Sequence, residues 1–332
     1  MPLNMYNSLA RYSLGTKRKP ANDPPNFVAS NNTAIMKEDR DDCAISEKGE
    51  YILSCHSSNG AYLSKNYGST FDKVFTLTKG CCAISYDGKY MLYGGWSGVI
   101  HRSEDYGNID TFSPCSLSKN WKRIRMSFDG KYCLASTYNN YVYLSNNFGV
   151  SFTETTITTS AAMEDVDIAM SKTGQYMISI KKNSSTNDLI RISSNSGASW
   201  TEKTLTGLTN FATSCALSED GQTAFIGSRG YENLYKITNL SDTSPTVELI
   251  PGALNIKCGS ISVSSDGLYI FISDIQTAKM YYSTNGGSVF KLISVPINTI
   301  NISTVAMTPD ARIIIGNNRY PFNNYKLFIS NA

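Results

Sequence analysis

Two arginines on one short stretch, Arg123 and Arg125, are the side chains in this chain best suited to chemistry. Residues two apart on a strand point to the same side, so both guanidinium groups would act on one space. Two distant acids, Asp42 and Asp167, occupy matching places in an internal repeat described below. Such a set can form structural ion pairs between neighbouring units, or it can hold a small anionic ligand. Both interpretations stay open on the sequence alone.

Cysteine and histidine are the other reactive residue types. The chain has eight cysteines and two histidines, and no Cys-X-X-Cys pair, so we predict no metal site and no cofactor. Cys43, Cys82 and Cys215 share one repeat position, where the other units have Ile or Val. Cysteine is therefore expected to serve as a small, reduced core residue, which fits synthesis in a reducing compartment.

The elements that must position these residues recur seven times. Each unit has an apolar strand, a Ser or Thr, a tight turn usually containing Asp-Gly or Thr-Gly, and a second strand rich in Tyr and branched residues. The aligned hydroxyl residues are Ser46, Ser85, Ser127, Ser171, Ser218, Ser264 and Thr308. Their spacings of 39 to 47 residues suit four-stranded propeller blades. Helical periodicity is almost absent, so the sequence predicts an all-β, seven-bladed β-propeller.

The last unit ends early, because residues 327–332 reach only a third strand. An open blade would expose unpaired backbone groups, so we expect the segment 27–40 to donate the missing strand. The predicted organisation is a single propeller over 27–332, preceded by a basic arm and linker over 1–26. The first twenty residues of the arm contain four basic residues and no acid, which is typical of a solvated tail or of contact with an acidic partner.

A second motif follows the third strand of most units and reads Ser-X-Asn/Asp-X-Gly, then Phe or Trp. Five full copies occur, among them SKNYGSTF at 64–71 and SSNSGASW at 193–200. We expect the Asx side chain to accept hydrogen bonds from backbone N–H groups two residues on, and the Gly to be left-handed. The aromatic residue should pack beneath the turn. The positions concerned are Asn66, Gly68, Asp105, Gly107, Asn147, Gly149, Asn195, Gly197, Trp200, Asn285 and Gly287.

This motif resembles the Asp-box, or bacterial neuraminidase repeat, although Asn usually replaces Asp here and the fifth unit lacks the Gly and the aromatic. The resemblance implies a sialidase-like propeller whose boxes lie on the blade periphery. Sialidases also use an arginine triad, a Tyr–Glu pair, an Asp acid/base and an Arg-Ile-Pro-type motif near the start of the propeller. The nearest string here is Arg319-Tyr320-Pro321, in the last unit. We therefore predict no catalytic residues, with a sialidase-like glycoside hydrolase as the alternative.

Positions at which one unit departs from the residue type of the other units are candidates for function. Two residues before the aligned hydroxyl, six units have Ala or Ser, whereas the third has Arg125. Four residues before it, the third unit has Arg123, and the first and fourth have Asp42 and Asp167. First strands line the central channel of a propeller, so these four residues form the candidate channel site, with an Arg123–Asp167 pair between neighbouring blades.

Aromatic residues outside the repeat pattern form a second candidate. They fall in the loops between second and third strands, which share one rim of the ring, and are Trp96, Tyr138, Tyr141, Tyr231, Tyr320 and Phe322. Such residues suit stacking on sugars or docking of a protein, although packing within the turns is the simpler interpretation.

Composition narrows the class of function without naming a ligand. A net charge of +3 disfavours nucleic acid, and no apolar run is long enough for a membrane span. The N-terminus lacks a signal-peptide layout, so ordinary secretion is not expected. We predict a non-enzymatic binding or structural module of a larger particle, such as a virion, tail or appendage, with a protein or glycan partner and the arm 1–26 as anchor. An intracellular assembly-factor propeller is the second alternative.

Overall fold

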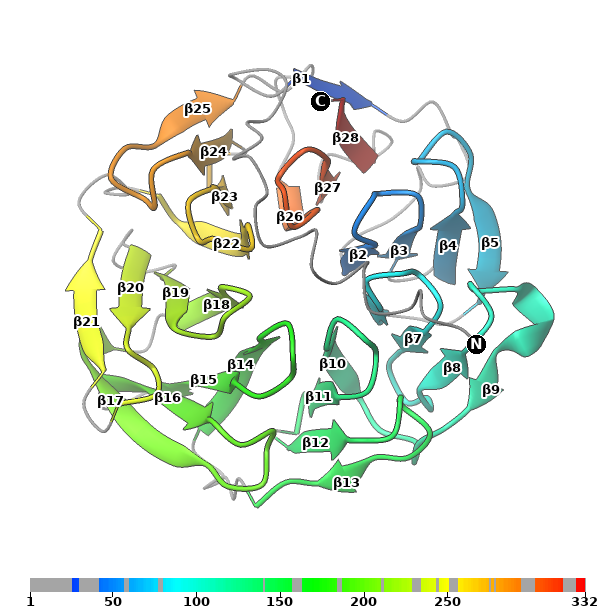
Figure 1. The fold of residues 1–332 in the computed structure, drawn as a ribbon, viewed down its shortest axis with the longest axis horizontal. Helices are drawn as coiled ribbons and strands as arrows, with labels where there is room; N and C mark the ends of the chain where they lie inside the picture. The colour runs from blue at the N-terminus through cyan, green and yellow to red at the C-terminus, as the bar shows by residue number, and fades with distance from the viewer. Residues whose placement is uncertain are drawn as a thin grey trace, which may run out of the picture.

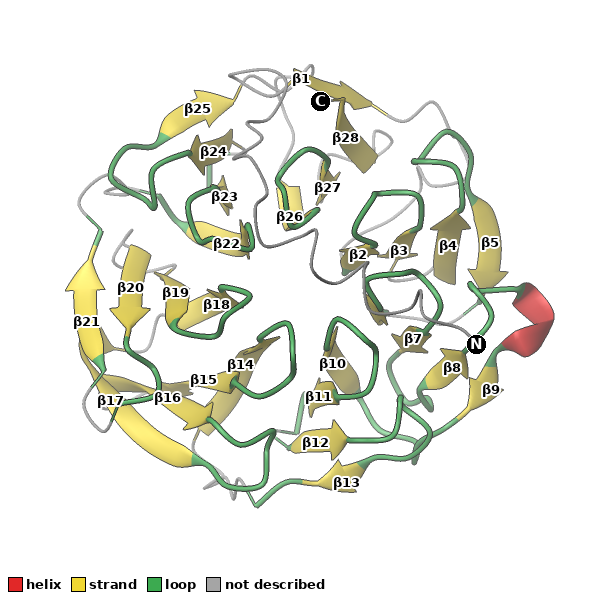
Figure 2. Cartoon of the chain, viewed as in Figure 1, coloured by secondary structure: helices red, strands yellow, loops and turns green. Residues whose placement is uncertain are grey.

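The computed structural model describes most of the chain in a series of ranges. These are residues 26–29, 42–56, 60–76, 80–139, 141–156, 163–183, 187–209, 212–228, 234–242, 245–250, 256–274, 276–277, 279–293, 302–318 and 327–331. The described strands form four-stranded antiparallel sheets that stand side by side in a ring (Figure 1). Strands and turns account for nearly all of this ring, apart from the short 3₁₀ helix η2 (Ile109–Thr111) (Figure 2).

Six of the sheets are self-contained blades, each made of four consecutive strands. We number them blade 1 to blade 6 in chain order. Blade 1 comprises β2 (Cys43–Ile45), β3 (Ile52–His56), β4 (Gly60–Ser64) and β5 (Asp72–Phe75). Blade 2 comprises β6 (Cys81–Ile84), β7 (Met91–Gly94), β8 (His101–Ser103) and β9 (Ser113–Pro114). Blade 3 comprises β10 (Trp121–Met126), β11 (Cys133–Thr137), β12 (Val142–Ser145) and β13 (Thr153–Glu154).

The other three self-contained blades follow the same order from the centre of the ring outward. Blade 4 comprises β14 (Met163–Met170), β15 (Met177–Asn183), β16 (Asn187–Ser193) and β17 (Thr201–Thr209). Blade 5 comprises β18 (Ala212–Leu217), β19 (Thr223–Ser228), β20 (Leu234–Thr238) and β21 (Thr246–Leu249). Blade 6 comprises β22 (Cys258–Val263), β23 (Ile270–Asp274), β24 (Lys279–Ser283) and β25 (Lys291–Ile293).

The remaining sheet is composite and joins the two ends of the described chain. Its strands are β26 (Ile302–Met307), β27 (Ile314–Asn318), β28 (Leu327–Asn331) and, on the outside, β1 (Asn26–Ala29). The predicted count of seven blades is therefore corrected to six self-contained blades, and we call the composite sheet the closing sheet. The predicted boundaries also need correction. The closing strand β1 lies at the start of the segment 27–40 that was expected to supply it, and it begins one residue earlier, at Asn26, which the sequence placed in the arm.

The aligned hydroxyl residue of each repeat organises the hairpin between the first two strands. In blade 3, the Ser127 hydroxyl donates to Asp129 at 2.7 Å and accepts the Tyr132 N–H at 2.9 Å. The hydroxyl thus satisfies a backbone donor that the turn leaves without a ladder partner. In every repeat the hydroxyl accepts the backbone N–H of the residue five positions later, including Thr308, which accepts from Ile313 at 3.1 Å. This hydrogen bond is why Ser or Thr recurs there.

A chain of backbone hydrogen bonds joins these hairpins around the ring. The residue after each aligned hydroxyl donates its N–H to the carbonyl of the equivalent residue in the next unit, at 2.8 to 3.2 Å. The six donor–acceptor links are Glu47–Tyr86, Tyr86–Phe128, Phe128–Lys172, Lys172–Glu219, Glu219–Ser265 and Ser265–Pro309. A seventh link would need a donor from Pro309, which has no backbone N–H. The chain of bonds therefore stops between the closing sheet and blade 1.

The recurring Ser-X-Asn-X-Gly turn is held by its own side chains. In blade 4, Ser193 Oγ accepts the Gly197 N–H at 2.8 Å and donates to Asn195 Oδ1 at 3.0 Å. Asn195 Oδ1 also accepts the Ser199 N–H at 2.9 Å. The Asx contact thus reaches four residues on, not two as expected, because Ser196 and Gly197 both take positive φ and lengthen the turn. Trp200 packs against the core between blades 3 and 4.

Apolar packing lies mainly between adjacent sheets. Trp121 and Ile124 of blade 3, for example, share a buried cluster with Leu92 and Ile100 of blade 2. Blade 1 packs against the closing sheet through a smaller cluster that contains Ile52 and Ile315. The first strands are thereby fixed around the centre of the ring. Within the described ranges, no helix has the length and apolarity to cross a membrane.

Candidate functional site: the arginine cluster of the central cavity

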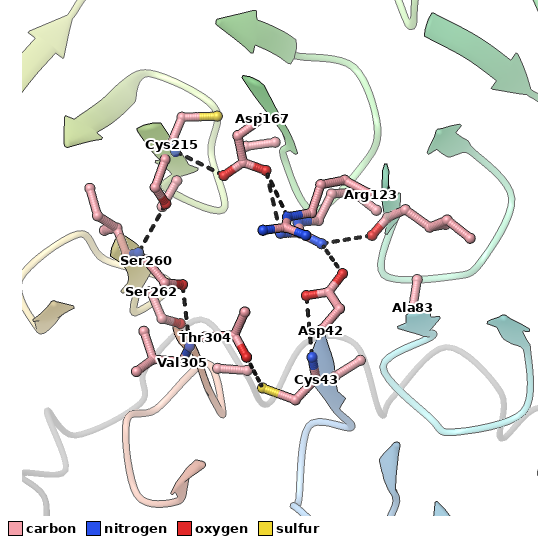
Figure 3. A pocket seen from close by; sticks show the side chains of 18 of the residues that line it. Asp42, Cys43, Ala83, Arg123, Asp167, Cys215, Ser260, Ser262, Thr304 and Val305 are labelled. Carbon is pink, nitrogen blue, oxygen red and sulfur yellow. Dashed lines mark hydrogen bonds and ion pairs between the residues drawn. The ribbon is translucent and has the colours of Figure 1, made fainter. Parts of the chain in front are cut away.

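The first strands of the blades and the closing sheet line a cavity of about 250 Å³ that is open to solvent. Its walls are mainly small residues of the repeat, such as Ala83, Ala169 and Ala216. Larger apolar residues such as Met126 and Leu217 complete the walls, and the cationic residues of the lining are Arg123 and Arg125, both on β10 of blade 3. Figure 3 shows Arg123 and Asp167 on one side of this cavity and Ser260 and Ser262 on the other. The structure thus brings the four predicted channel residues to a single place.

Arg125 connects three blades. Its Nη1 donates to Asp42 Oδ2 at 3.0 Å, and its Nη2 lies 3.7 Å from Asp167 Oδ1. Asp42 belongs to blade 1, so the side chain passes over blade 2, where Ala83 leaves it room. A longer side chain at position 83 would occupy this path. The small side chain of Ala83 therefore leaves space for the contact between Arg125 and Asp42.

Arg123 makes weaker polar contacts. Its Nε lies 3.6 Å from Asp167 Oδ1, so the two form the predicted ion pair between blades 3 and 4 at longer than hydrogen-bond distance. Burial opposes the charge of Arg123, but Asp42 and Asp167 together outweigh it and raise the pKa of the guanidinium. The same balance of burial against the two carboxylates raises the pKa of Arg125. Both arginines are therefore cations at any physiological pH.

The carboxylates sit behind the guanidinium groups. The side chains of Asp42 and Asp167 are 4% and 5% exposed, against 32% for Arg125 and 27% for Arg123. Asp167 also accepts the backbone N–H groups of Ile168 and Cys215, both at 3.0 Å. A molecule in the cavity would therefore contact the guanidinium donors before the carboxylates, although the four side chains together carry no net charge.

The bond from Cys215 to Asp167 belongs to a series of contacts that the sequence did not reveal. In the fourth, fifth and sixth units, the polar side chain four residues before the aligned hydroxyl accepts a backbone N–H of the following unit. Ser214 Oγ accepts the Ile261 N–H at 3.0 Å, and Ser260 Oγ accepts the Val305 N–H at 3.2 Å. The signal was present in the alignment, because most units place a polar residue at this position. We call these contacts the inter-blade latches.

Thiols around the cavity are protected. Burial raises the pKa of Cys43 and Cys215, and nearby carboxylates raise it further. A thiol held in its neutral form is a poor nucleophile. Among the described residues no group of three or more His, Cys, Asp or Glu side chains is placed to hold a metal ion. The described cavity wall thus offers hydrogen-bond donors and hydroxyl groups to a bound molecule.

The aromatic rim residues fall into two sets. Trp96, between β7 and β8, contacts Tyr138, between β11 and β12, with ring centroids 4.8 Å apart. Tyr141 lies on the same hairpin as Tyr138, and the two tyrosines are 41% and 39% exposed. These three residues, which we call the rim cluster, share the edge of blades 2 and 3. Tyr231, Tyr320 and Phe322 lie outside the described residues.

The ring of four-stranded sheets around a central cavity defines the class of fold, which is the β-propeller. Neither a protein-family model nor a curated protein sequence matches the chain.

Solved structures do match it. The chain is similar to the Cps50 (Swd1) β-propeller domain of Myceliophteria thermophila, with a TM-score of 0.70 and 11% identity over 92% of this chain and 99% of that one. It is equally similar to YCF48 from Cyanidioschyzon merolae, with a TM-score of 0.70 and 13% identity over 92% and 98%. Hydrazine synthase of Kuenenia stuttgartiensis gives a TM-score of 0.68 and 11% identity over 90% and 97%. At such identities the likeness concerns the fold alone.

Proposed function

We propose that this propeller is a non-catalytic module that binds a protein partner through the rim cluster of blades 2 and 3. The observation that carries the proposal is the pair of exposed tyrosines, Tyr138 and Tyr141, beside Trp96. Tyr and Trp combine a large apolar area with a polar group and few rotatable bonds, and they are enriched where proteins bind one another. One of the similar structures, a YCF48, has a title stating that it is bound to a D1 peptide, so this fold supports recognition of a protein segment.

The geometry of the cavity carboxylates argues against the glycoside hydrolase alternative. Hydrolysis of that kind needs one carboxyl group to protonate the leaving oxygen and a second group to act from the other face of the sugar. Asp42 and Asp167 are instead nearly inaccessible and occupied by arginines and backbone N–H groups. The resemblance of the recurring turn to the Asp-box then concerns the architecture of the blades and not a catalytic site. Hydrolysis of a fluorogenic sialoside by the purified protein would contradict this part of the proposal.

We further propose that the protein is a component of a larger particle, with residues 1–25 as its anchor. The four basic residues of this segment would contact an acidic partner surface. The deletion should end at residue 25, because Asn26 begins the closing strand. We expect the shortened protein to keep its unfolding transition and to lose co-sedimentation with the particle. Unchanged co-sedimentation would contradict anchoring.

Site-specific photocrosslinking in the native host tests the rim cluster. A photoreactive phenylalanine at position 141 should give a discrete protein adduct. The matched control is position 150, where Val150 is 54% exposed. Position 150 lies between β12 and β13, at the opposite edge of blade 3 from the β11–β12 hairpin. Equal labelling from both positions, or no protein adduct from position 141, would refute the proposal. A glycan-only adduct would favour sugar binding instead.

A further inference from the structure

We propose that the central cavity is a binding site for a small carboxylate anion, which Arg123 and Arg125 hold by hydrogen bonds. This inference does not depend on the rim cluster. It rests on the guanidinium N–H groups that make no hydrogen bond within the described part of the chain and on the polarity of the opposite wall. The volume of the cavity and the placement of its charged side chains support it as well.

The two guanidinium groups carry many more donors than they use. Each has five N–H groups, so the pair has ten. Three hydrogen bonds engage them within the described part of the chain: Arg125 to Asp42 and to the Ile124 carbonyl, and Arg123 to the Lys122 carbonyl. The contacts with Asp167, at 3.6 and 3.7 Å, contribute charge but exceed hydrogen-bond distance. Most of the donors are therefore available to a ligand in the cavity that both side chains line.

The opposite wall is polar and the space is adequate. Ser260, Ser262 and Thr304 line the cavity together with small alanines. A volume of about 250 Å³ corresponds to that of about eight water molecules, at roughly 30 Å³ each. A small organic acid, or the last residue of a peptide, fits such a volume and can meet arginines on one side and hydroxyl groups on the other.

The charges favour a carboxylate over a phosphate or sulfate. Asp42 and Asp167 balance the two arginines, so these four side chains supply no net positive charge to neutralise the second charge of a dianion. A carboxylate also presents two coplanar oxygens, which match the fork of a guanidinium group. The proposal therefore names a monoanionic carboxylate, either a free acid or the carboxylate of a partner protein.

A titration with ¹³C-labelled acetate, followed by NMR line broadening, tests the site directly. The probe should broaden saturably with the wild-type protein at constant ionic strength. Arg123→Gln should weaken binding at least about tenfold, because it removes a charge-assisted hydrogen bond to the anion. The matched control is Arg312→Gln, since Arg312 is an exposed arginine outside the cavity that is paired with Asp310. Equal binding by the wild type and Arg123→Gln, or none by the wild type, would overturn the proposal.

A second variant and a second ligand separate loss of binding from loss of folding and identify the source of the carboxylate. Arg123→Lys retains the charge and loses the fork, so it should fold and bind acetate more weakly than the wild type; wild-type affinity in this variant would contradict the geometry. Triglycine with a free carboxyl terminus, compared with its amide, then distinguishes the sources. Tighter binding of the free peptide than of acetate would identify a partner's terminus. Binding of acetate alone would identify a free acid, and binding of the amide as tightly as the free peptide would overturn carboxylate recognition.

Discussion

Loss of the Arg125–Asp42 ion pair is the perturbation whose outcome the structure defines best. The contact joins blades 1 and 3 at 3.0 Å, and the Asp42 side chain is 4% exposed. Removing one partner of a buried pair leaves the other charge without compensation and costs about 3–5 kcal/mol. Solvent screens Arg125, which is 32% exposed, so we expect the lower value of about 3 kcal/mol for Arg125→Met.

A double-mutant cycle isolates this interaction. Asp42→Asn keeps the oxygen that accepts the Cys43 N–H, removes the charge, and replaces the oxygen that accepts from Arg125 by an NH2 donor. At roughly 2.1 cal/mol/K per residue, a protein of 332 residues loses about 4 °C in Tm for 3 kcal/mol. Each single variant should show about this loss. The double variant should lose little more than either one, because after the first substitution no pair remains to be broken.

The measurement is urea unfolding of the four proteins, followed by circular dichroism. Additive losses in the double variant would refute the reasoning, since independent residues add. Single losses under about 0.5 kcal/mol would do the same, because they are typical of surface substitutions. Arg312→Gln serves as the control for loss of an arginine in an exposed ion pair and should change the free energy of unfolding by less than about 1 kcal/mol.

Three further results are expected. Ser214→Ala removes the acceptor for the Ile261 N–H and should lower the free energy of unfolding by about 1–3 kcal/mol, whereas Ser262→Ala in the same cavity wall should change it little; equal effects in urea unfolding would refute the latch. Gly197→Ala places a Cβ at a φ of +81°, 2.6 Å from Leu144 Cδ2, and should cost at least about 1 kcal/mol, so an unchanged urea midpoint would contradict the turn geometry. Burial raises the pKa of Cys115 to about 12, above the ordinary thiol value near 8.5. The stability that this thiol contributes is therefore complete below pH 8.5 and is lost as the pH rises toward 12, and Cys115→Val should flatten that decline in urea midpoints measured from pH 7 to 10.5.

The fold could be predicted from the sequence to the extent that each unit repeats the same hydrogen bonds. The aligned position is Ser or Thr in every unit because its hydroxyl group accepts the backbone N–H five residues later. The closing strand was harder to place. Strand β1 pairs with β28 through backbone groups, and no residue type in Asn26–Ala29 marks that pairing, so its bounds did not follow from the repeat.

The sequence predicts which residues form the candidate site, but it does not predict which contacts these residues make. Strand alternation places Arg123 and Arg125 toward the same space, and repeat position adds the two acids. Alternation gives the direction of a side chain and not its reach, so the contact from Arg125 past blade 2 to Asp42 was missed. The contact of Asp167 with the Cys215 N–H was missed for a related reason: the alignment shows a polar residue at this repeat position, but it does not show which backbone N–H the side chain reaches.

Among the described residues, the junction between the closing sheet and blade 1 lacks the backbone link that joins the other units, and the cavity touches both sides of this junction. Pro309 cannot donate the backbone bond that would join the closing sheet to blade 1. Apolar packing that includes Ile315, together with a contact of 3.8 Å between Cys43 Sγ and Thr304 Oγ1, joins the two sides instead. Asp42 lies on one side of this junction and Thr304 on the other, and both line the cavity. An anion that engages Arg125, which is bonded to Asp42, and the hydroxyl of Thr304 would therefore bridge the junction from within, adding polar contacts where proline removes one.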